Sequence, residues 1–478
     1  MTRTAARLNI WEPISRSYSH SWRALRHRNF QLFFFGQSIS VIGNWMTRLA
    51  TTWLVYHLTH SALLLGIVSF AGQIVSFLLG PFAGVWIERI GRLNRRKLLV
   101  ATQAAAAVQS LALAALTLAH IITLWEIIAL TALQGVINAF DMPARQSFLA
   151  QMVQTGEGRA GEGQAGLDRN DLSNAIAINS SMANGARLVG PAIAGLVIAA
   201  YGEGWCFMID GVSYFAVIAS LLLMRIHRFE DSRSKASMLE QMREGWDYVR
   251  TFRPIRTILL LFSLISLMGY SYAVVLPIFA AQVLHGGAAT LGWLMGASGV
   301  GALASAISLA FRKTVVGLTR MVQIAAAMLG AGLILFGLSH TLWLSLLLMV
   351  FVGFGLLQCA SASNTIIQSL VPEDKRARAM SYYTMAFFGS APFGSLLAGA
   401  LAQRIGAPHT VMVTGAFCIA GSLWFTFELP KMRAVMRPIY ESMGLLPGRG
   451  SVYEAVHESV SVPAQVTELT SAVQGPAQ

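Results

Sequence analysis

The sequence predicts an all-helical polytopic membrane protein, with twelve transmembrane helices arranged as two six-helix bundles around a central cavity. Three observations predict this fold class. Hydrophobic residues make up 55% of the 478 residues and charged residues only 12%, against roughly 25% charge in a soluble globular protein. Apolar runs of spanning length recur along the chain, and basic residues gather in alternate segments between them.

The apolar runs reach the roughly 20 residues that one helix needs to cross a bilayer. They are too long and too uniform for the alternating strands of a transmembrane barrel. The first run follows some thirty mostly polar residues, so we expect no cleaved signal peptide. We expect spans near residues 30–57, 62–87, 98–119, 122–142, 173–200, 205–226, 257–284, 289–311, 319–339, 341–369, 379–403 and 409–428.

The basic residues indicate the orientation of these spans. With the amino terminus in the cytoplasm, only Arg48, Arg187 and Arg404 of the 35 Lys and Arg lie outside the cytoplasmic segments. This is the positive-inside asymmetry. We therefore expect a multi-pass protein of a bacterial inner membrane with both termini in the cytoplasm. Topology accounts for the net charge of +13, so we expect no nucleic-acid partner.

The longest charged stretch between spans divides the chain at its centre. Within it, Trp246 and Val249 alternate with Asp247 and Arg250, a pattern typical of an amphipathic helix on a membrane surface. We expect a cytoplasmic amino-terminal segment, an amino-terminal bundle, a cytoplasmic amphipathic linker, a carboxy-terminal bundle and a loosely ordered cytoplasmic tail. These divisions are 1–29, 30–226, 227–256, 257–429 and 430–478.

Motifs of other protein classes are missing from the sequence. The three cysteines lie in apolar runs, and the ten histidines form no HExxH pattern, so we expect no metal site. No GxxxxGK[ST] phosphate loop is present, which argues against an ATP-driven pump. No serine or cysteine stands in a recognisable nucleophile motif. We therefore expect a protein that is not an enzyme and that uses no cofactor.

The segment from Gly84 to Lys97 holds a glycine, an acid, a base, a second glycine and a basic run. It resembles the signature motif of the major facilitator superfamily, in the loop between the second and third spans. The resemblance implies a carboxylate that ties loop arginines into a network closing the cytoplasmic side. Glu88 stands where Asp is usual, and either Arg92 or Arg95 takes the first arginine position. The gate candidates here are Gly84, Glu88, Arg89, Gly91, Arg92 and Arg95.

Two further stretches resemble one branch of this superfamily. Residues 43–56 and the segment from Asp141 to Gln146 are similar to the secretion-effector branch, which contains enterobactin exporters and macrolide efflux pumps. By this resemblance Asp141 and Arg145 face the loop network, and they join the gate candidates. Anchoring at the inner leaflet is the alternative for Arg145.

Small residues in the run 173–200 resemble the glycine and proline motif of the antiporter branch, which points to export. They allow tight helix packing, and ordinary packing is the alternative. The motif residues are Ala186, Gly190, Pro191 and Gly195. One expected residue is missing, because Thr131 holds the position where proton antiporters of this superfamily carry an arginine before a Gln-Gly pair.

Four charged residues inside spans are coupling candidates, since charge in a membrane is costly. Arg48 and Arg187 lie deep, whereas Glu126 and Asp210 lie nearer the external surface. A buried carboxylate steadied by an arginine can take up a proton and change its pairing. Static ion pairs, or side chains reaching the interface, are the alternative.

Polar and aromatic residues on the spans that face the cavity in this superfamily are substrate candidates, although ordinary interhelical hydrogen bonding accounts for such residues too. A wall rich in Tyr and Phe and poor in charge fits a large amphipathic molecule. The candidates are Asn44, Trp45, Thr51, Gln134, Asn138, Tyr270, Tyr272, Gln358 and Asn364.

These features together predict a secondary transporter that exports an amphipathic small molecule of drug or siderophore type, by proton antiport with alternating access. Its expected partners are that small substrate, protons and the lipid bilayer, and we expect a monomer. An importer, or a lipid or lysophospholipid flippase on the same fold, is the alternative.

Overall fold

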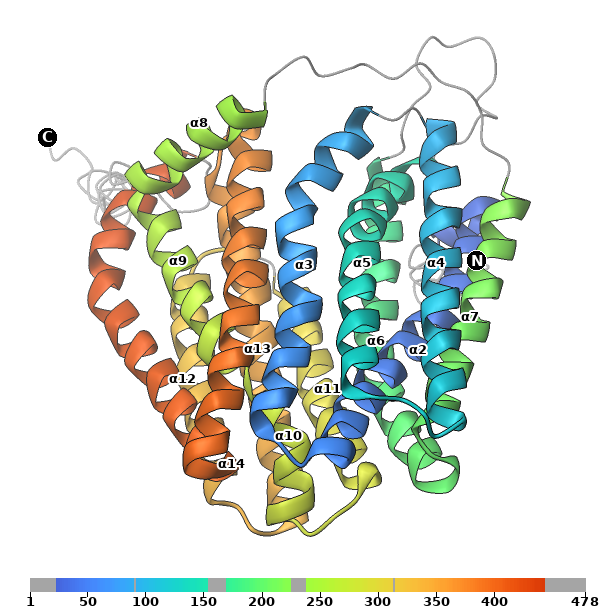
Figure 1. Cartoon of the computed structure of the whole chain (residues 1–478). Helices are drawn as coiled ribbons and strands as arrows, with labels where there is room; N and C mark the ends of the chain where they lie inside the picture. Colours follow the sequence, from blue (N-terminus) through green and yellow to red (C-terminus); the bar gives the residue numbers. More distant parts are fainter. Residues whose placement is uncertain (1–22, 90–91, 154–168, 225–237, 313, 443–478) are drawn as a thin grey trace, which may run out of the picture.

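The computed structural model describes residues 23–89, 92–153, 169–224, 238–312 and 314–442. Long helices stand side by side, and a shorter helix, α8, lies across one end of the molecule (Figure 1). The helices are η1 (Arg23–Arg26), α2 (Arg28–Thr59), α3 (Ala62–Arg89), α4 (Arg92–Leu118), α5 (Leu124–Val153), α6 (Arg169–Tyr201), α7 (Glu203–Leu223), α8 (Met238–Thr251), α9 (Arg253–Leu264), η2 (Ile265–Gly269), α10 (Tyr272–Ile278), η3 (Phe279–Val283), α11 (Ala288–Ala310), α12 (Leu318–Leu338), α13 (Leu342–Leu370) and α14 (Glu373–Ser442).

Within the described residues, ten helical stretches are long and apolar enough to cross a membrane. One of them, Arg378–Ser442, has 65 residues, and its backbone leaves helical geometry at Gly406, with φ 81° and ψ 163°. It therefore contains both predicted runs 379–403 and 409–428. The 32-residue α2 is not among the ten, because Gln, Ser, Asn, Thr and Arg side chains lower its hydropathy. The chain is thus an all-helical, multi-pass membrane protein.

Left-handed backbone positions mark the turns at the end remote from α8. Gly202 separates α6 from α7 with φ 89°, and Gly406 bends α14 with φ 81°. Glycine adopts this conformation without the Cβ clash that other residues meet. His60, with φ 48°, ends α2 and donates its backbone N–H to the Tyr56 carbonyl.

The predicted span 257–284 is not one uniform helix. Two π-helical segments, η2 and η3, flank the short α10, which contains Pro277. A π-helical turn inserts an extra residue into the helix and re-aims the side chains that follow, and such turns are frequent at functional sites. Tyr270 and Tyr272 lie directly after η2, so this irregularity sets their directions.

Small residues join the amino-terminal helices to the carboxy-terminal ones. A Cβ on Gly195 of α6 would lie 2.8 Å from the Ala288 carbonyl oxygen of α11, and one on Gly66 of α3 would lie 2.9 Å from the Ser395 carbonyl oxygen of α14. Both contacts lie toward the end remote from α8. In contrast, a Cβ on Gly80 or Gly84 would meet nothing within 4 Å. Gly84, one of the gate candidates, therefore makes no close helix contact in this structure.

Two helices lie in segments that we assigned to the linker and the tail. The linker segment 227–256 contains α8, whose Gly245 and Val249 are buried. The tail was expected to be loosely ordered from residue 430, but α14 continues through Pro430 to Ser442 and buries Met432, Met436 and Tyr440. These apolar side chains recur at helical spacing, which stabilises residues 430–442 as a helix packed on the bundle. The amino-terminal residues 1–22 and the tail beyond 442 lie outside the described residues.

Candidate functional site

The two deep arginines meet on one tryptophan ring. The Arg48 guanidinium carbon lies 5.2 Å from the centre of the Trp45 ring, one turn away on α2. Arg187 reaches the same ring from α6, at 5.7 Å. Both distances lie within the range of cation–π contacts. At 1.5 Å per residue, the arginines lie about 16 and 21 Å from the carboxyl ends of α2 and α6, at comparable depth in the apolar layer.

Glycine at position 190 allows this meeting. A Cβ on Gly190 would lie 2.6 Å from the Trp45 Cβ and 3.1 Å from the Ile42 carbonyl oxygen. The α6 and α2 backbones can approach this closely only because Gly190 has no side chain. Ala186 and Pro191 are buried in the same helix, and Gly195 faces α11. The small-residue motif on α6 therefore packs against two different neighbours.

Residues of the carboxy-terminal half also lie beside Arg187. The buried Tyr272 hydroxyl lies 2.9 Å from the Ser298 Oγ and interacts with Arg187. A Cβ on Gly299 of α11 would lie 3.1 Å from the Arg187 carbonyl oxygen. Trp45, Arg48, Arg187 and Tyr272 therefore form one group, here called the arginine cluster, where α2, α6, α10 and α11 meet.

The arginine cluster does not contain the acids that we expected to pair with it. Among the residues that the structure describes, no carboxylate forms an ion pair with Arg48 or Arg187. Glu126 instead accepts the Thr123 backbone N–H at 2.7 Å. That contact caps the start of α5, where a carboxylate satisfies backbone donors that have no partner inside the helix. Glu126 is therefore placed as a helix cap and not as a partner of either arginine.

Asp210 occupies a buried site of its own. The residue is 1% exposed, and its Oδ2 accepts hydrogen bonds from the Thr47 hydroxyl at 2.8 Å and the Ser110 hydroxyl at 3.1 Å. Its Oδ1 is buried without a hydrogen-bond partner and faces Gly43, where a Cβ would lie 2.8 Å away. The site is formed by α2, α4 and α7. A carboxyl oxygen in this position can carry a proton without losing an existing bond.

Asp141 of α5 joins that helix to α4. Its Oδ1 accepts bonds from the Thr102 hydroxyl at 2.9 Å and the Gln103 amide at 2.7 Å, and its Oδ2 accepts a bond from Arg145. Thr102 and Gln103 belong to α4, the helix that follows the predicted gate loop. The Arg95 Nε donates to the Ile87 carbonyl. The side chains of Glu88, Arg89 and Arg92 and the residue Gly91 lie outside the described part of the chain.

Several predicted cavity residues make ordinary interhelical or local contacts instead. Gln358 is 1% exposed and accepts bonds from the Ser305 and Ser308 hydroxyls at 2.8 and 3.0 Å, so it joins α13 to α11. Tyr272 of the arginine cluster is also buried. The local contacts join Thr51 to the Thr47 carbonyl, Gln134 to Asn138, and Gln368 to Asn364.

Other cavity candidates keep accessible surface. Asn44 and Asn138 are exposed, and the Asn44 amide lies 3.4 Å from the Tyr214 hydroxyl. Tyr270 is partly exposed and packs edge-on against Phe387, with ring centres 5.3 Å apart. Thr47 and Ser110, which hold Asp210, were missed by sequence reasoning. No spacing along the chain could have linked them, because they come from different helices than the carboxylate.

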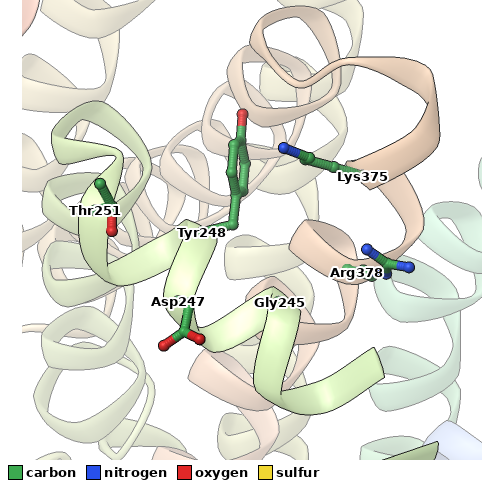
Figure 2. Close-up of a pocket in the computed structure, with 6 residues that line it drawn as sticks. All are labelled: Gly245, Asp247, Tyr248, Thr251, Lys375 and Arg378. Carbon is green, nitrogen blue, oxygen red and sulfur yellow. The ribbon is translucent and has the colours of Figure 1, made fainter. Parts of the chain in front are cut away.

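A pocket of about 450 Å³ lies elsewhere, between α8 and the beginning of α14. The Lys375 amine lies 5.1 Å from the centre of the Tyr248 ring, toward which it points in Figure 2. A Cβ on Gly245 would lie 2.9 Å from the Tyr382 ring, so glycine lets α8 lie close to α14. This pocket belongs to the linker surface and not to the arginine cluster.

A family model described as a transmembrane secretion effector matches residues 19–444. The chain belongs to this family of major facilitator transporters. It is 25% identical to the staphyloferrin A transporter of Staphylococcus aureus, over 84% of this chain and 96% of that protein. It is also 25% identical to the multidrug efflux pump Tap of Mycolicibacterium fortuitum, over 80% of this chain and 91% of that protein.

The fold of this secretion effector agrees with solved transporters. A bacterial homologue of the iron transporter ferroportin in an inward-facing state superposes with a TM-score of 0.63 and 16% identity, over 84% of this chain and 98% of that one. The family membership confirms the resemblance found at the loop motif and in the first and fourth spans. It makes this protein a membrane transporter and not an enzyme.

Proposed function

We propose that this secretion effector is a secondary transporter with twelve spans in a six plus six arrangement, which exports an amphipathic small molecule of drug or siderophore type. The two parts of α14 on either side of Gly406, together with α2, complete the twelve. The names of the efflux pump and of the staphyloferrin A transporter among its relatives support this substrate class. A bacterial inner membrane, with α8 on the cytoplasmic side, agrees with the distribution of basic residues.

The buried carboxyl group of Asp210, which has no cation as a partner among the described residues, is the observation that supports proton coupling. A charged carboxylate in a buried site costs free energy unless it is paired, and among the described residues Asp210 has two hydroxyl donors but no cation. A proton on Oδ1 makes the group neutral and suits it to burial. We therefore assign uptake and release of the coupled proton to Asp210, with Thr47 and Ser110 holding the other oxygen in place.

The helix contacts support a state that is open toward α8. Gly66 and Gly195 pack against the opposite half near the remote end, whereas Gly80 and Gly84 have open space around them. Rocking of the two bundles would open the remote end and close the end near α8. In that opposite state Gly84 would come into contact, and Glu88, Asp141 and the loop arginines would hold the closure.

The experiment uses inverted membrane vesicles that contain the full chain and a dye reporting internal acidity. A macrolide, a cationic dye and a carboxylate siderophore are added in turn. We expect at least one compound to dissipate the acid interior with the wild type, and none to do so with D210N. The matched control is E203Q, because Glu203 lies on the same helix but pairs with His57 at 3.4 Å; this variant should keep coupling.

Proton-linked transport that survives in D210N at equal expression would contradict the assignment of Asp210. If no compound dissipates the gradient, while a labelled compound or a labelled lysophospholipid moves in the opposite direction, export is wrong and the importer or flippase alternative takes its place.

A further inference from the structure

The arginine cluster places two positive side chains on one ring inside the membrane-spanning region. Arg48 and Arg187 lie 5.2 and 5.7 Å from the centre of the Trp45 ring, so their guanidinium carbons are no more than about 11 Å apart, and like charges at this range repel. Within the described part of the chain no carboxylate pairs with either one. An intramembrane arginine needs a partner or a water-filled space.

Asp210, the buried acid beside α2, is engaged elsewhere. Thr47 precedes Arg48 directly in α2, but its hydroxyl bonds to Asp210 on α7, whereas Arg48 lies over Trp45. The α2 helix therefore presents the acid site and the arginine cluster on different faces. Among the described residues no counter-charge for the two arginines is present, which leaves room for an external anion to supply one.

The two arginines of the arginine cluster are accessible enough for an external anion to supply the counter-charge. Arg48 and Asn44, one turn apart on α2, are both exposed, and Trp45 and Arg187 are partly exposed. Guanidinium groups bind carboxylates through paired, charge-assisted hydrogen bonds. The Asn44 amide adds a further donor nearby, and the Trp45 ring supplies apolar surface for the rest of a ligand.

We propose that the arginine cluster is the binding site for the acid group of the transported molecule, and that the substrate class is therefore an amphipathic carboxylate. This inference rests on the proposed transport function but not on its direction or on proton coupling. Arg48 and Arg187 then act in substrate binding, which is a different role from the coupling that the sequence suggested, and Asp210 acts in coupling. Because Thr47 and Arg48 are neighbours on α2, a shift of this one helix affects both sites.

Binding of three probes that share one ring system tests the proposal. The probes are 2-naphthoate, 2-naphthylmethanol and 2-naphthylmethylamine, which carry negative, zero and positive charge. Their binding to the purified full chain in nanodiscs of neutral phosphatidylcholine is measured by equilibrium dialysis, without any gradient. We expect 2-naphthoate to bind at least about tenfold more tightly than the alcohol, and the amine to bind most weakly.

Variants that remove equal charge distinguish binding at the arginine cluster from a general electrostatic effect of the protein. R48Q/R187Q should lose the preference for 2-naphthoate and keep binding of the alcohol, which also reports that the site is folded. R320Q/R404Q removes the same charge from two exposed positions and should keep the preference. R48K/R187K retains the charge but should keep only part of the preference for 2-naphthoate, because lysine cannot form the bidentate fork.

Equal affinity for naphthoate and the alcohol in the wild type would overturn the proposal, as would a preference that survives in R48Q/R187Q. These outcomes are distinct from failure of the proposed function. Naphthoate binding that depends on the arginines, in a protein that moves no protons in vesicles, supports the site and refutes only the coupling. Proton-linked export of a cationic dye without any naphthoate preference refutes only the substrate class.

Discussion

Replacing Gly190 by Ala should weaken the protein by pushing α6 away from α2. The new methyl group would lie 2.6 Å from the Trp45 Cβ, whereas carbon atoms in contact normally lie about 3.5 to 4.0 Å apart. Relief of the clash requires a movement of about 1 Å between two long helices. Overpacking of this kind costs about 1 to 3 kcal/mol, and the better helix propensity of alanine offsets about 0.5 to 1 kcal/mol.

Gly185 provides the matched control on the same helix. A Cβ there would meet nothing within 4 Å, so Gly185→Ala should stabilise the protein through the better helix propensity of alanine alone. The two variants should therefore differ by about 1 to 3 kcal/mol in the free energy of unfolding, with Gly190→Ala the less stable. The same displacement moves Arg187 from the Trp45 ring, and affinity for 2-naphthoate should fall in Gly190→Ala alone.

The assay is unfolding of the purified full chain in one detergent, followed by intrinsic fluorescence against temperature and against SDS. The wild type should lie between the two variants. If Gly190→Ala unfolds at or above the midpoint of Gly185→Ala, then the close approach at Trp45 does not restrain α6, and the reasoning from the glycine contact is wrong.

Three other predictions follow from contacts described above. Gly84→Leu should leave the free energy of unfolding unchanged, because the surroundings of Gly84 are open here. It should slow transport by obstructing the opposite state, and unchanged transport rates in vesicles would contradict the gate role of Gly84. Asp141→Ala should lower the free energy of unfolding by about 3 to 5 kcal/mol, because it leaves Arg145 without its acid. Thr102→Val should lower it by only about 1 kcal/mol, and unfolding curves of the two variants would show the difference. Gly245→Leu should move α8 away from Tyr382, so spin labels placed on α8 and α14 should report a longer distance than in the wild type.

The sequence alone was sufficient for the membrane character, the positions of most spans and the family. A helix satisfies its own backbone hydrogen bonds, so the bilayer requires each span to be apolar along its own length, and that property is local and visible in the chain. The runs 62–87 and 289–311, for example, correspond closely to α3 and α11. The loop motif around Glu88 is equally local, and the family match confirmed the resemblance that it suggested.

The environment of each polar residue was decided by the tertiary structure. Arg48, Glu126, Arg187 and Asp210 look alike in sequence, as charges in or near apolar runs. In the fold, two of them meet on Trp45, one caps a helix, and Asp210 is held by hydroxyls from α2 and α4. Side-chain partners depend on which helix faces come together, and neighbours from three helices far apart in the chain leave no pattern in the spacing of residues along it.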